Sequence, residues 1–454
     1  MNFTGPIIAI LFIVLVAYLL IKKYYPHAVL LIAGLVMLVV AWVLQFPLPE
    51  LNKSTGATGL DLFRFIKESF AETNAGVGLM IMAIGGFVAY IDKIGASNAL
   101  VYIAMKPLSL LRKYPHITAS AVIPIGQILF VCIPSAAGLS LLLMASIYPI
   151  LLNIGVSRLS AVSVITACTA IGIGPASAIT ASAVSIAEVS SVNYFLNDQV
   201  PLTIPLVIVS TICYYFVNRY FDSKDTSETE LTVQPEEPKL TAPLIYAIIP
   251  VLPLILLIVF SDVFQILSIP VLLDTTTAMF ISLFVALIFE LIRTRNIREV
   301  FQSLKVFWNG MGNIFKTVVT LIIAADIFSK GLIALEFIDG LVFTSQNVGL
   351  EAVGIGIVMT VMIFLASMLM GSGNAAFFAF APLVPDIASK LGVKSTLMLL
   401  PMNFAASMGR TVSPVAGVLI ATAEIAEVST FQIVKRNLIP LVAALLVMLI
   451  YHFI

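Results

Sequence analysis

The sequence has few charged residues. Of its 454 residues, only 11% are Asp, Glu, Lys or Arg, whereas 60% are hydrophobic and the mean hydropathy is +1.09. Soluble domains carry about 25% charged residues. The composition therefore predicts an integral membrane protein and excludes an ordinary soluble one. The 24 basic and 24 acidic residues cancel, which excludes the strongly basic surface of a nucleic-acid-binding protein.

Cysteine and histidine are also scarce. The chain has three of each, far apart in the sequence: Cys132, Cys168, Cys213, His27, His116 and His452. A disulfide framework or a metal centre needs clustered residues, so we expect buried hydrophobic cysteines and no metal site. The chain also shows no Ser/His pair, HExxH motif or paired aspartates of a membrane-embedded enzyme. We therefore predict neither catalytic residues nor an organic cofactor.

Long apolar stretches, in contrast, are abundant. The first has no basic segment before it, so we interpret it as a retained membrane helix rather than a signal peptide. Only residues 222–241 interrupt the series with a charged segment typical of a solvated linker. The sequence predicts an all-α polytopic membrane protein with an N-terminal half (1–221), a linker (222–242) and a C-terminal half (243–454). The stretches that are long enough, or nearly so, to span a bilayer are 5–21, 28–46, 76–91, 116–133, 159–189, 200–217, 243–260, 276–292, 314–328, 350–370, 396–426 and 438–454.

The placement of Lys and Arg predicts the orientation in the membrane. The loops at 190–199 and 262–275 contain neither residue. Since cytoplasmic loops carry the excess of Lys and Arg, we predict a cytoplasmic linker and both chain ends on the periplasmic or extracellular side. The segment 47–75, which we interpret as an outer loop, carries three basic residues and fits this rule less well. The residues assigned to the cytoplasmic side are Lys22, Lys23, Lys106, Arg112, Lys113, Arg158, Arg219, Lys239, Arg293, Arg295, Arg298, Lys435 and Arg436.

Two segments of the chain resemble each other. Residues 175–201 align without a gap on residues 414–440, with seven of 27 positions identical, a shared IAEVS block and a proline at each end. Counting helices places the two copies in opposite orientations, with polar turns near 133–140 and 371–374 that open from opposite sides. We predict two inverted-topology repeats, each with a re-entrant helical hairpin and an interrupted helix, as in secondary transporters. Chance similarity of two apolar helices is the alternative.

Four short segments break the helical pattern inside apolar sequence: PSAAG (134–138), GIGPAS (172–177), GSGN (371–374) and GRTVSP (409–414). Irregular backbone persists in a membrane only where it lines a cavity or contacts protein. Helices that start after such breaks present free N–H groups, which favour a bound anion. Ordinary kinks between closely packed helices are the alternative. The predicted substrate-binding residues are Ser135, Gly138, Ser177, Ser372, Gly373, Asn374, Arg410, Thr411 and Ser413.

Arg410 and Asp326 are charged residues in apolar surroundings. An arginine in mid-membrane costs roughly 2.5–3.5 kcal/mol on insertion scales, and no carboxylate lies close to Arg410 in the sequence. Its partner can be an anionic substrate; alternatively, its side chain reaches the surface from a helix end. Asp326 is a candidate for ion coupling, or it pairs with Lys330 one turn later. Asn403 is a second candidate for ion coupling.

Weaker signals concern the helix ends and the membrane surface. The segments 94–113 and 331–349 are only weakly hydrophobic and follow the same position in each half. We expect two arm helices that lie along the membrane surface. Glu188 and Glu427, the glutamates of the two IAEVS blocks, are expected at helix ends near the surface.

The second half carries motifs of a known family. GSGNAAFFAF (371–380), GRTVSPVAGV (409–418) and VKRNLIP (434–440) resemble patterns of the anaerobic C4-dicarboxylate carrier (DcuC) family of the ion transporter superfamily. The resemblance covers nearly the whole chain. It implies exchange or efflux of fumarate, succinate and malate across the bacterial inner membrane. It also implies an elevator-like homodimer with a scaffold and a mobile transport domain, and leaves H⁺ and Na⁺ open as coupling ions.

The first half departs from this family pattern. Residues 134–138 read PSAAG where the family pattern is Ser-Ser-Ala-Thr-Gly, and residues 175–179 read PASAI where it is Pro-Thr-Ser-Gly-Asp. Three hydroxyls and a carboxylate are missing from that half of the site. A sugar acid, a tricarboxylate or an amino acid therefore stays open as the substrate, and an ion channel is a further alternative.

Overall fold

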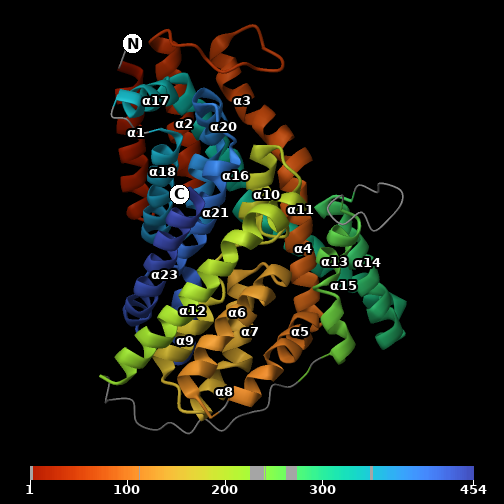
Figure 1. Ribbon diagram of the computed structural model, residues 1–454. Coiled ribbons are helices and arrows are strands. Elements are labelled where there is room, and N and C mark those ends of the chain that lie inside the picture. The colour runs from red at the N-terminus through yellow and green to blue at the C-terminus, as the bar shows by residue number, and fades with distance from the viewer. Residues whose placement is uncertain are drawn as a thin grey trace.

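A computed structural model of the chain describes residues 4–111, 113–224, 240, 242–261, 273–347 and 351–453. The described residues form helices joined by turns (Figure 1), and ten of these helices are long and apolar enough to cross a membrane. Large apolar side chains point outward from several of them, for example Leu11, Phe216 and Phe284, each more than 60% exposed. Such surfaces are unfavourable in water and normal in lipid. The prediction of a multi-pass, all-helical membrane protein is confirmed.

Two long helices, each with a π turn near its middle, pack against each other on one side of the molecule. In the first helix Gly76 is not helical (φ −103°, ψ −114°), so its π turn is a kink. The π turns contact each other. The flanking helices α2 (Pro26–Val43) and α14 (Thr275–Thr294) pack against α16 and α4, respectively. We call α1 to α4 and α14 to α16, with both π turns, the crossed-helix group. The parts of the long helices, together with α1, are α1 (Thr4–Ile21), α3 (Thr58–Thr73), η1 (Asn74–Gly78), α4 (Leu79–Lys93), α15 (Ile297–Ile314), η5 (Phe315–Val319) and α16 (Thr320–Ala334).

Two sequence predictions, for the segments 47–75 and 243–260, are wrong. The segment 47–75, predicted to be a loop, contains α3, which buries Leu62 and Phe65 and places charged residues such as Lys67 and Glu72 between its apolar ones. An amphipathic helix of this kind leaves no continuous apolar run. The stretch 243–260 is not one span, because η4 (Leu244–Ile248) and α13 (Leu252–Val259) are separate elements. Pro250 and Pro253 lie where the helix is interrupted and remove backbone donors.

The remaining core consists of two helical hairpins, two interrupted helices and two long closing helices, which we call the central group. Hairpin 1 is α6 and α7, and hairpin 2 is α18 and α19. Break 1 (168–177) separates α9 from α10, and break 2 (412–416) separates α21 from α22. The closing helices α12 and α23 lie side by side. The bounds are α6 (Pro115–Cys132), α7 (Ala136–Ser146), α9 (Arg158–Ala167), α10 (Ala178–Ala187), α12 (Val200–Asp222), α18 (Ala352–Met370), α19 (Gly373–Phe380), α21 (Thr396–Thr411), α22 (Gly417–Ala426) and α23 (Thr430–Phe453).

Short elements complete both halves. The segments predicted as arms contain α5 (Ala96–Met105) and α17 (Phe337–Asn347), and Figure 1 shows these two helices at opposite ends of the molecule. Glu188 and Glu427 end α10 and α22 in the left-handed conformation and are exposed. The matching IAEVS blocks thus encode two equivalent helix ends. The other short elements are η2 (Lys106–Leu111), α8 (Tyr148–Asn153), α11 (Ser191–Asn193), η3 (Tyr194–Gln199), η6 (Ala381–Leu383) and α20 (Val384–Leu391).

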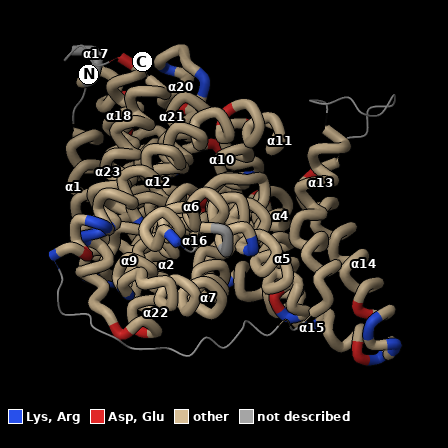
Figure 2. The backbone as a smooth tube through the Cα atoms, turned by 60° about the horizontal axis from the view of Figure 1, so that its bottom comes forward, with Lys and Arg blue, Asp and Glu red and all other residues tan. Residues whose placement is uncertain are grey.

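Charges are rare in the fold and mark its ends. Figure 2 shows a group of them at the turn between α14 and α15, and it places both chain ends beside α17, α18 and α20. Most of the predicted linker (225–239 and 241), most of the predicted outer loop 262–275 (262–272) and Arg112 lie outside the described residues. The linker's predicted course and the side to which Lys239 belongs are therefore not described.

Candidate functional site

The two interrupted helices meet and are joined by side-chain hydrogen bonds. Break 1 leaves carbonyl groups at the end of α9 without helical partners. Arg410, near the end of α21, donates from its guanidinium group to the carbonyl oxygen of Thr169 over 2.6 Å. Asn403, two turns earlier, donates to the carbonyl oxygen of Gly172, also over 2.6 Å. One face of α21 thus satisfies the irregular backbone of break 1.

A buried amide holds the other end of break 1. Gln199, at the end of η3, accepts a hydrogen bond from the backbone N–H of Gly174 at 2.9 Å and donates to the Thr180 hydroxyl at 3.0 Å. That hydroxyl lies 3.4 Å from the side-chain oxygen of Asn403. Gln199, Thr180 and Asn403 are all fully buried. Every polar atom in this network therefore depends on protein partners, because an unpaired one costs about 1–3 kcal/mol.

Break 2 is held in the same way by α23. Asn437 donates to the carbonyl oxygen of Thr411 and to the Thr166 hydroxyl, each at 3.0 Å. The Thr411 hydroxyl donates to the backbone oxygen of Ser407, and the Ser413 hydroxyl accepts from the N–H of Val415 at 3.3 Å. The break begins three residues later than predicted, because α21 continues through Thr411. Arg410 is consequently held by a helix and not by a loop.

The tip of hairpin 2 rests on break 2. Gly371 ends α18 with φ of 71°, and a Cβ atom there would lie 2.9 Å from the backbone of Val415. A Cβ atom on Gly373 would lie 2.6 Å from the carbonyl oxygen of Ala406. Only glycine permits this conformation and these contacts. The Ser372 hydroxyl caps α19 by accepting from the N–H of Ala375 at 3.2 Å.

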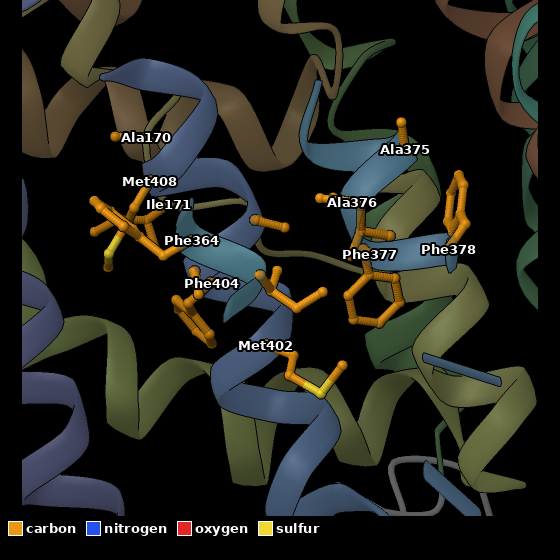
Figure 3. Close-up of a cluster of buried hydrophobic side chains, with 14 of the residues drawn as sticks. Ala170, Ile171, Phe364, Ala375, Ala376, Phe377, Phe378, Met402, Phe404 and Met408 are labelled. Carbon is orange, nitrogen blue, oxygen red and sulfur yellow. The ribbon is translucent and has the colours of Figure 1, made fainter. Parts of the chain in front are cut away.

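An apolar cluster surrounds this tip. Figure 3 shows buried side chains from break 1, α18, α19 and α21. Phe377 of α19 and Phe404 of α21 are fully buried. Ser372 and Asn374 are the half-buried polar side chains of the tip. Their polar groups and the guanidinium of Arg410 are thus set in an apolar surrounding, where interactions between charges are stronger than in water.

Hairpin 1 makes different contacts. The Ser135 hydroxyl caps α7 by accepting from the N–H of Gly138 at 3.1 Å. A Cβ atom on Gly138 would lie 3.6 Å from a carboxylate oxygen of Asp92, which belongs to α4. Pro134 at the tip and Pro175 in break 1 line a small cavity of about 10 Å³ that faces the crossed-helix group. Ser135 and Gly138 thus lie at the boundary between the two groups of helices.

Ser177 and Asp326 complete the set of predicted residues. Ser177 precedes α10 and is half-buried, and its side chain does not cap that helix. Asp326 belongs to the crossed-helix group, where it forms an ion pair with Lys330 and accepts a hydrogen bond from Ser69 at 2.5 Å. The structure thus contains the pairing that the four-residue spacing allows.

The residues that sequence analysis missed are the buried amides Gln199 and Asn437. Their hydrogen bonds reach across 25 and 26 residues to the breaks, so no local pattern predicts them. One signal was available: both amides lie two or three residues before the aligned prolines Pro201 and Pro440.

A larger cavity of about 550 Å³ lies elsewhere, between α1, α16 and hairpin 2. Its lining is apolar throughout, with Val16, Phe328 and Met362 among its members. It offers no group to bind an anion.

Comparisons with known proteins agree on a transporter. Residues 5–454 match the model of the family described as C4-dicarboxylate anaerobic carrier, DcuC. The chain is 32% identical over 451 residues to the anaerobic C4-dicarboxylate transporter DcuC of Escherichia coli, covering 99% of this chain and 96% of that protein. It is 33% identical over 438 residues to the probable anaerobic C4-dicarboxylate transporter DcuC of Vibrio cholerae, covering 96% and 94%.

Solved structures share the fold at low sequence identity. MtrF of Neisseria gonorrhoeae, from work on a class of antimetabolite efflux pumps, superposes with a TM-score of 0.63 at 13% identity, covering 94% of this chain and 95% of that one. The YdaH transporter of Alcanivorax borkumensis gives a TM-score of 0.60 at 13% identity, covering 94% and 98%. These similarities concern the architecture alone.

Proposed function

Because the chain belongs to the C4-dicarboxylate anaerobic carrier family, we propose that it is a secondary transporter of C4-dicarboxylates such as fumarate, succinate and malate. It exchanges or exports them across the bacterial inner membrane by alternating access. The observation that carries this proposal is the junction of the two breaks, where the half-buried Arg410 donates to the carbonyl oxygen of Thr169.

Arg410 is the principal anion-binding group in this proposal. A guanidinium group has five N–H donors in a planar fork, and one nitrogen donates to Thr169. The other N–H groups of the fork are the proposed donors to a substrate carboxylate, which a fork binds with two parallel hydrogen bonds. Ser372, Gly373 and Asn374 contribute polar groups from hairpin 2. The remaining members of the proposed substrate site are Ser135, Gly138, Ser177, Thr411 and Ser413.

The two halves act as inverted repeats in this proposal. In each half a long helix with a central π turn is followed by an arm, a hairpin, an interrupted helix and a closing helix. The elements that follow hairpins 1 and 2, α8 and α20, lie at opposite ends of the molecule in Figure 1. Both observations support opposite orientations of the halves. The chain ends are then periplasmic and residues 222–242 cytoplasmic.

Alternating access requires one part to move against another. We assign the crossed-helix group to a scaffold and the central group to a mobile transport domain. The central group carries both breaks and both hairpin tips, so the substrate site moves as a unit. Gly138 against Asp92 is one contact across the boundary. The functional unit is a homodimer, with lipid on its outer apolar surface. H⁺ or Na⁺ is the coupling ion, with Asp326 and Asn403 as candidate coupling residues.

Counterflow into liposomes tests this proposal. Vesicles loaded with unlabelled succinate should accumulate labelled succinate or fumarate when they contain the protein, and empty vesicles should not. Uptake of a sugar acid, a tricarboxylate or an amino acid, with no uptake of any C4-dicarboxylate, would reject the substrate assignment. Ion currents far above the rate of a domain movement would instead indicate a channel.

A further inference from the structure

One face of the closing helix of the first half carries a polar side chain at almost every turn. The helix runs from η3 into α12, and the spacing of these side chains, four or seven residues, places them on one side. Five of them are buried, with an exposed fraction of 8% or less, and the Asp222 side chain is 13% exposed. The residues are Gln199, Thr203, Ser210, Tyr214, Asn218 and Asp222.

A second polar face, on α6, packs against this one. His116, Ser120 and Gln127 are four and seven residues apart on α6, which contacts α12. The ends of the contact are fixed: His116 Nδ1 lies 3.8 Å from a carboxylate oxygen of Asp222, and Gln127 donates to the carbonyl oxygen of Ala167 at 3.0 Å. Eleven residues of α-helix cover about 16 Å. The seam between these two faces therefore extends from the end of α12 to the edge of break 1.

The middle of the seam lacks protein partners, whereas Asp222 at one end has several. Asp222 accepts from Ser157 at 2.7 Å, from Ser160 at 2.8 Å and from Arg436 at 2.6 Å. Among the described protein atoms, no hydrogen-bond partner exists for five groups in between: the hydroxyls of Ser120, Ser210 and Tyr214, both amide atoms of Asn218, and the side-chain oxygen of Gln127.

Buried polar atoms almost always have a partner, and where protein supplies none it is ordered water. A single orphan hydroxyl is a local defect, but a row of orphans on two facing helices defines a binding site for several water molecules. Hydroxyl and amide groups both donate and accept, so they can hold these waters in one hydrogen-bonded chain.

We propose that the α6–α12 seam binds a chain of water molecules and carries protons between the His116–Asp222 end and break 1. A proton enters at His116, passes along the waters by exchange of hydrogen bonds, and is taken up by a carboxylate of the substrate at Arg410. Besides His116 and Asp222, the charged and titratable groups beside the seam in the described part of the chain include Arg436 of α23, which donates to Asp222, and Cys168, whose thiol lies 3.5 Å from the carbonyl oxygen of Val122 on α6. Cys213 of α12 precedes Tyr214 in the sequence. This proposal rests on the proposed transport function for its proton step only.

Radiolytic hydroxyl labelling of the full protein tests the water chain without any transport assay. Hydroxyl radicals generated from bound water modify adjacent aromatic side chains. Tyr214 and Tyr90 are both 0% exposed, but the hydroxyl of Tyr90 is 3.1 Å from Ser303 whereas that of Tyr214 has no described partner. We expect labelling of Tyr214 and none of Tyr90. Equal lack of labelling at both tyrosines would overturn the proposal.

Proton movement in liposomes tests the conduction step. The variants Asn218→Leu and Ser210→Ala should transport fewer protons per dicarboxylate molecule, as measured with a pH-sensitive dye inside the liposomes. Both variants should still catalyse counterflow of labelled succinate when the pH is equal on the two sides. Ser282→Ala is the matched control, because this buried hydroxyl donates to Ala278 in its own helix. An unchanged proton ratio in the two seam variants would overturn the conduction step. Absence of counterflow in the unmodified protein would instead reject the proposed function, and the labelling result would still decide the water chain.

Discussion

Arg410 donates a hydrogen bond to the backbone oxygen of Thr169, 241 residues earlier in the chain. A charged side chain of the second half thereby secures the helix interruption of the first half. The same arginine is the proposed anion-binding group, so binding a substrate and holding break 1 are tasks of one side chain. Variants of Arg410 separate these tasks from each other.

Arg410→Ala is expected to abolish succinate counterflow while the protein stays folded. A hydrogen bond to a charged group contributes about 1.5–3 kcal/mol, and each 1.4 kcal/mol is about tenfold in affinity. Arg410→Lys keeps the charge but loses the fork, so we expect it to bind succinate at least about tenfold more weakly. Isothermal titration and counterflow measure both. Arg298→Ala, at an exposed position, is the control, and native affinity in Arg410→Ala would show that the residue is purely structural.

Ser372 has a capping role that can be separated from substrate contact. Replacing an N-cap serine by alanine costs about 1 kcal/mol of stability, and by glycine only a few tenths. Ser372→Ala should therefore unfold at a lower temperature than Ser372→Gly in detergent. If the hydroxyl also binds the substrate, both variants should lose succinate affinity equally. Full affinity in Ser372→Gly would restrict the residue to capping.

Gly371→Ala should impair transport more than Gly392→Ala. Both glycines end a helix with positive φ, at 71° and 67°, so alanine meets a similar backbone strain of about 1–2 kcal/mol at each. Only Gly371 also lies against a neighbouring backbone, that of Val415, whereas nothing lies within 4 Å of a Cβ atom on Gly392. Thermal unfolding and counterflow of both variants give the comparison. Equal losses would show that the contact of hairpin 2 with break 2 is unimportant.

The Asp326–Lys330 pair is expected to act as a unit. Its side chains are 31% and 21% exposed, so the cost of Asp326→Asn should lie between about 1 kcal/mol for a surface pair and about 3–5 kcal/mol for a fully buried one. The double variant Asp326→Asn with Lys330→Met should recover part of that stability, because no unpaired charge is left. If proton coupling is lost in Asp326→Asn but kept in the double variant, the carboxylate itself is not the coupling group.

Much of the fold could be predicted because its causes are local. The apolar stretches 5–21 and 350–370 correspond to α1 and α18, since a membrane helix needs only length and hydropathy. All four interruptions contain proline or glycine, which change the backbone conformation at their own position. The helix α3 was missed, since its apolar residues recur at helical spacing among charged ones.

The site was harder to predict than the fold. Thr411 and Ser413 have the hydroxyls that the sequence suggests, yet both hydroxyls bond to nearby backbone. The partners of the breaks, Gln199 and Asn437, lie in the closing helices, and only the packing of distant segments brings them there. Arg410 was identified because a charged residue is conspicuous in an apolar stretch of sequence. Its partner, the carbonyl oxygen of Thr169, could not be predicted, because every residue has a backbone carbonyl group.

The π turn between α15 and α16 has a consequence for chain length. A π turn holds one residue more than the α-helix needs. Deleting one residue from Phe315–Val319 would therefore restore a regular helix and leave the side chains on either side facing their present neighbours. A deletion one turn away in α16 would instead rotate everything beyond it by roughly 100°. Relatives that differ by one residue in this helix should place the gap at this π turn.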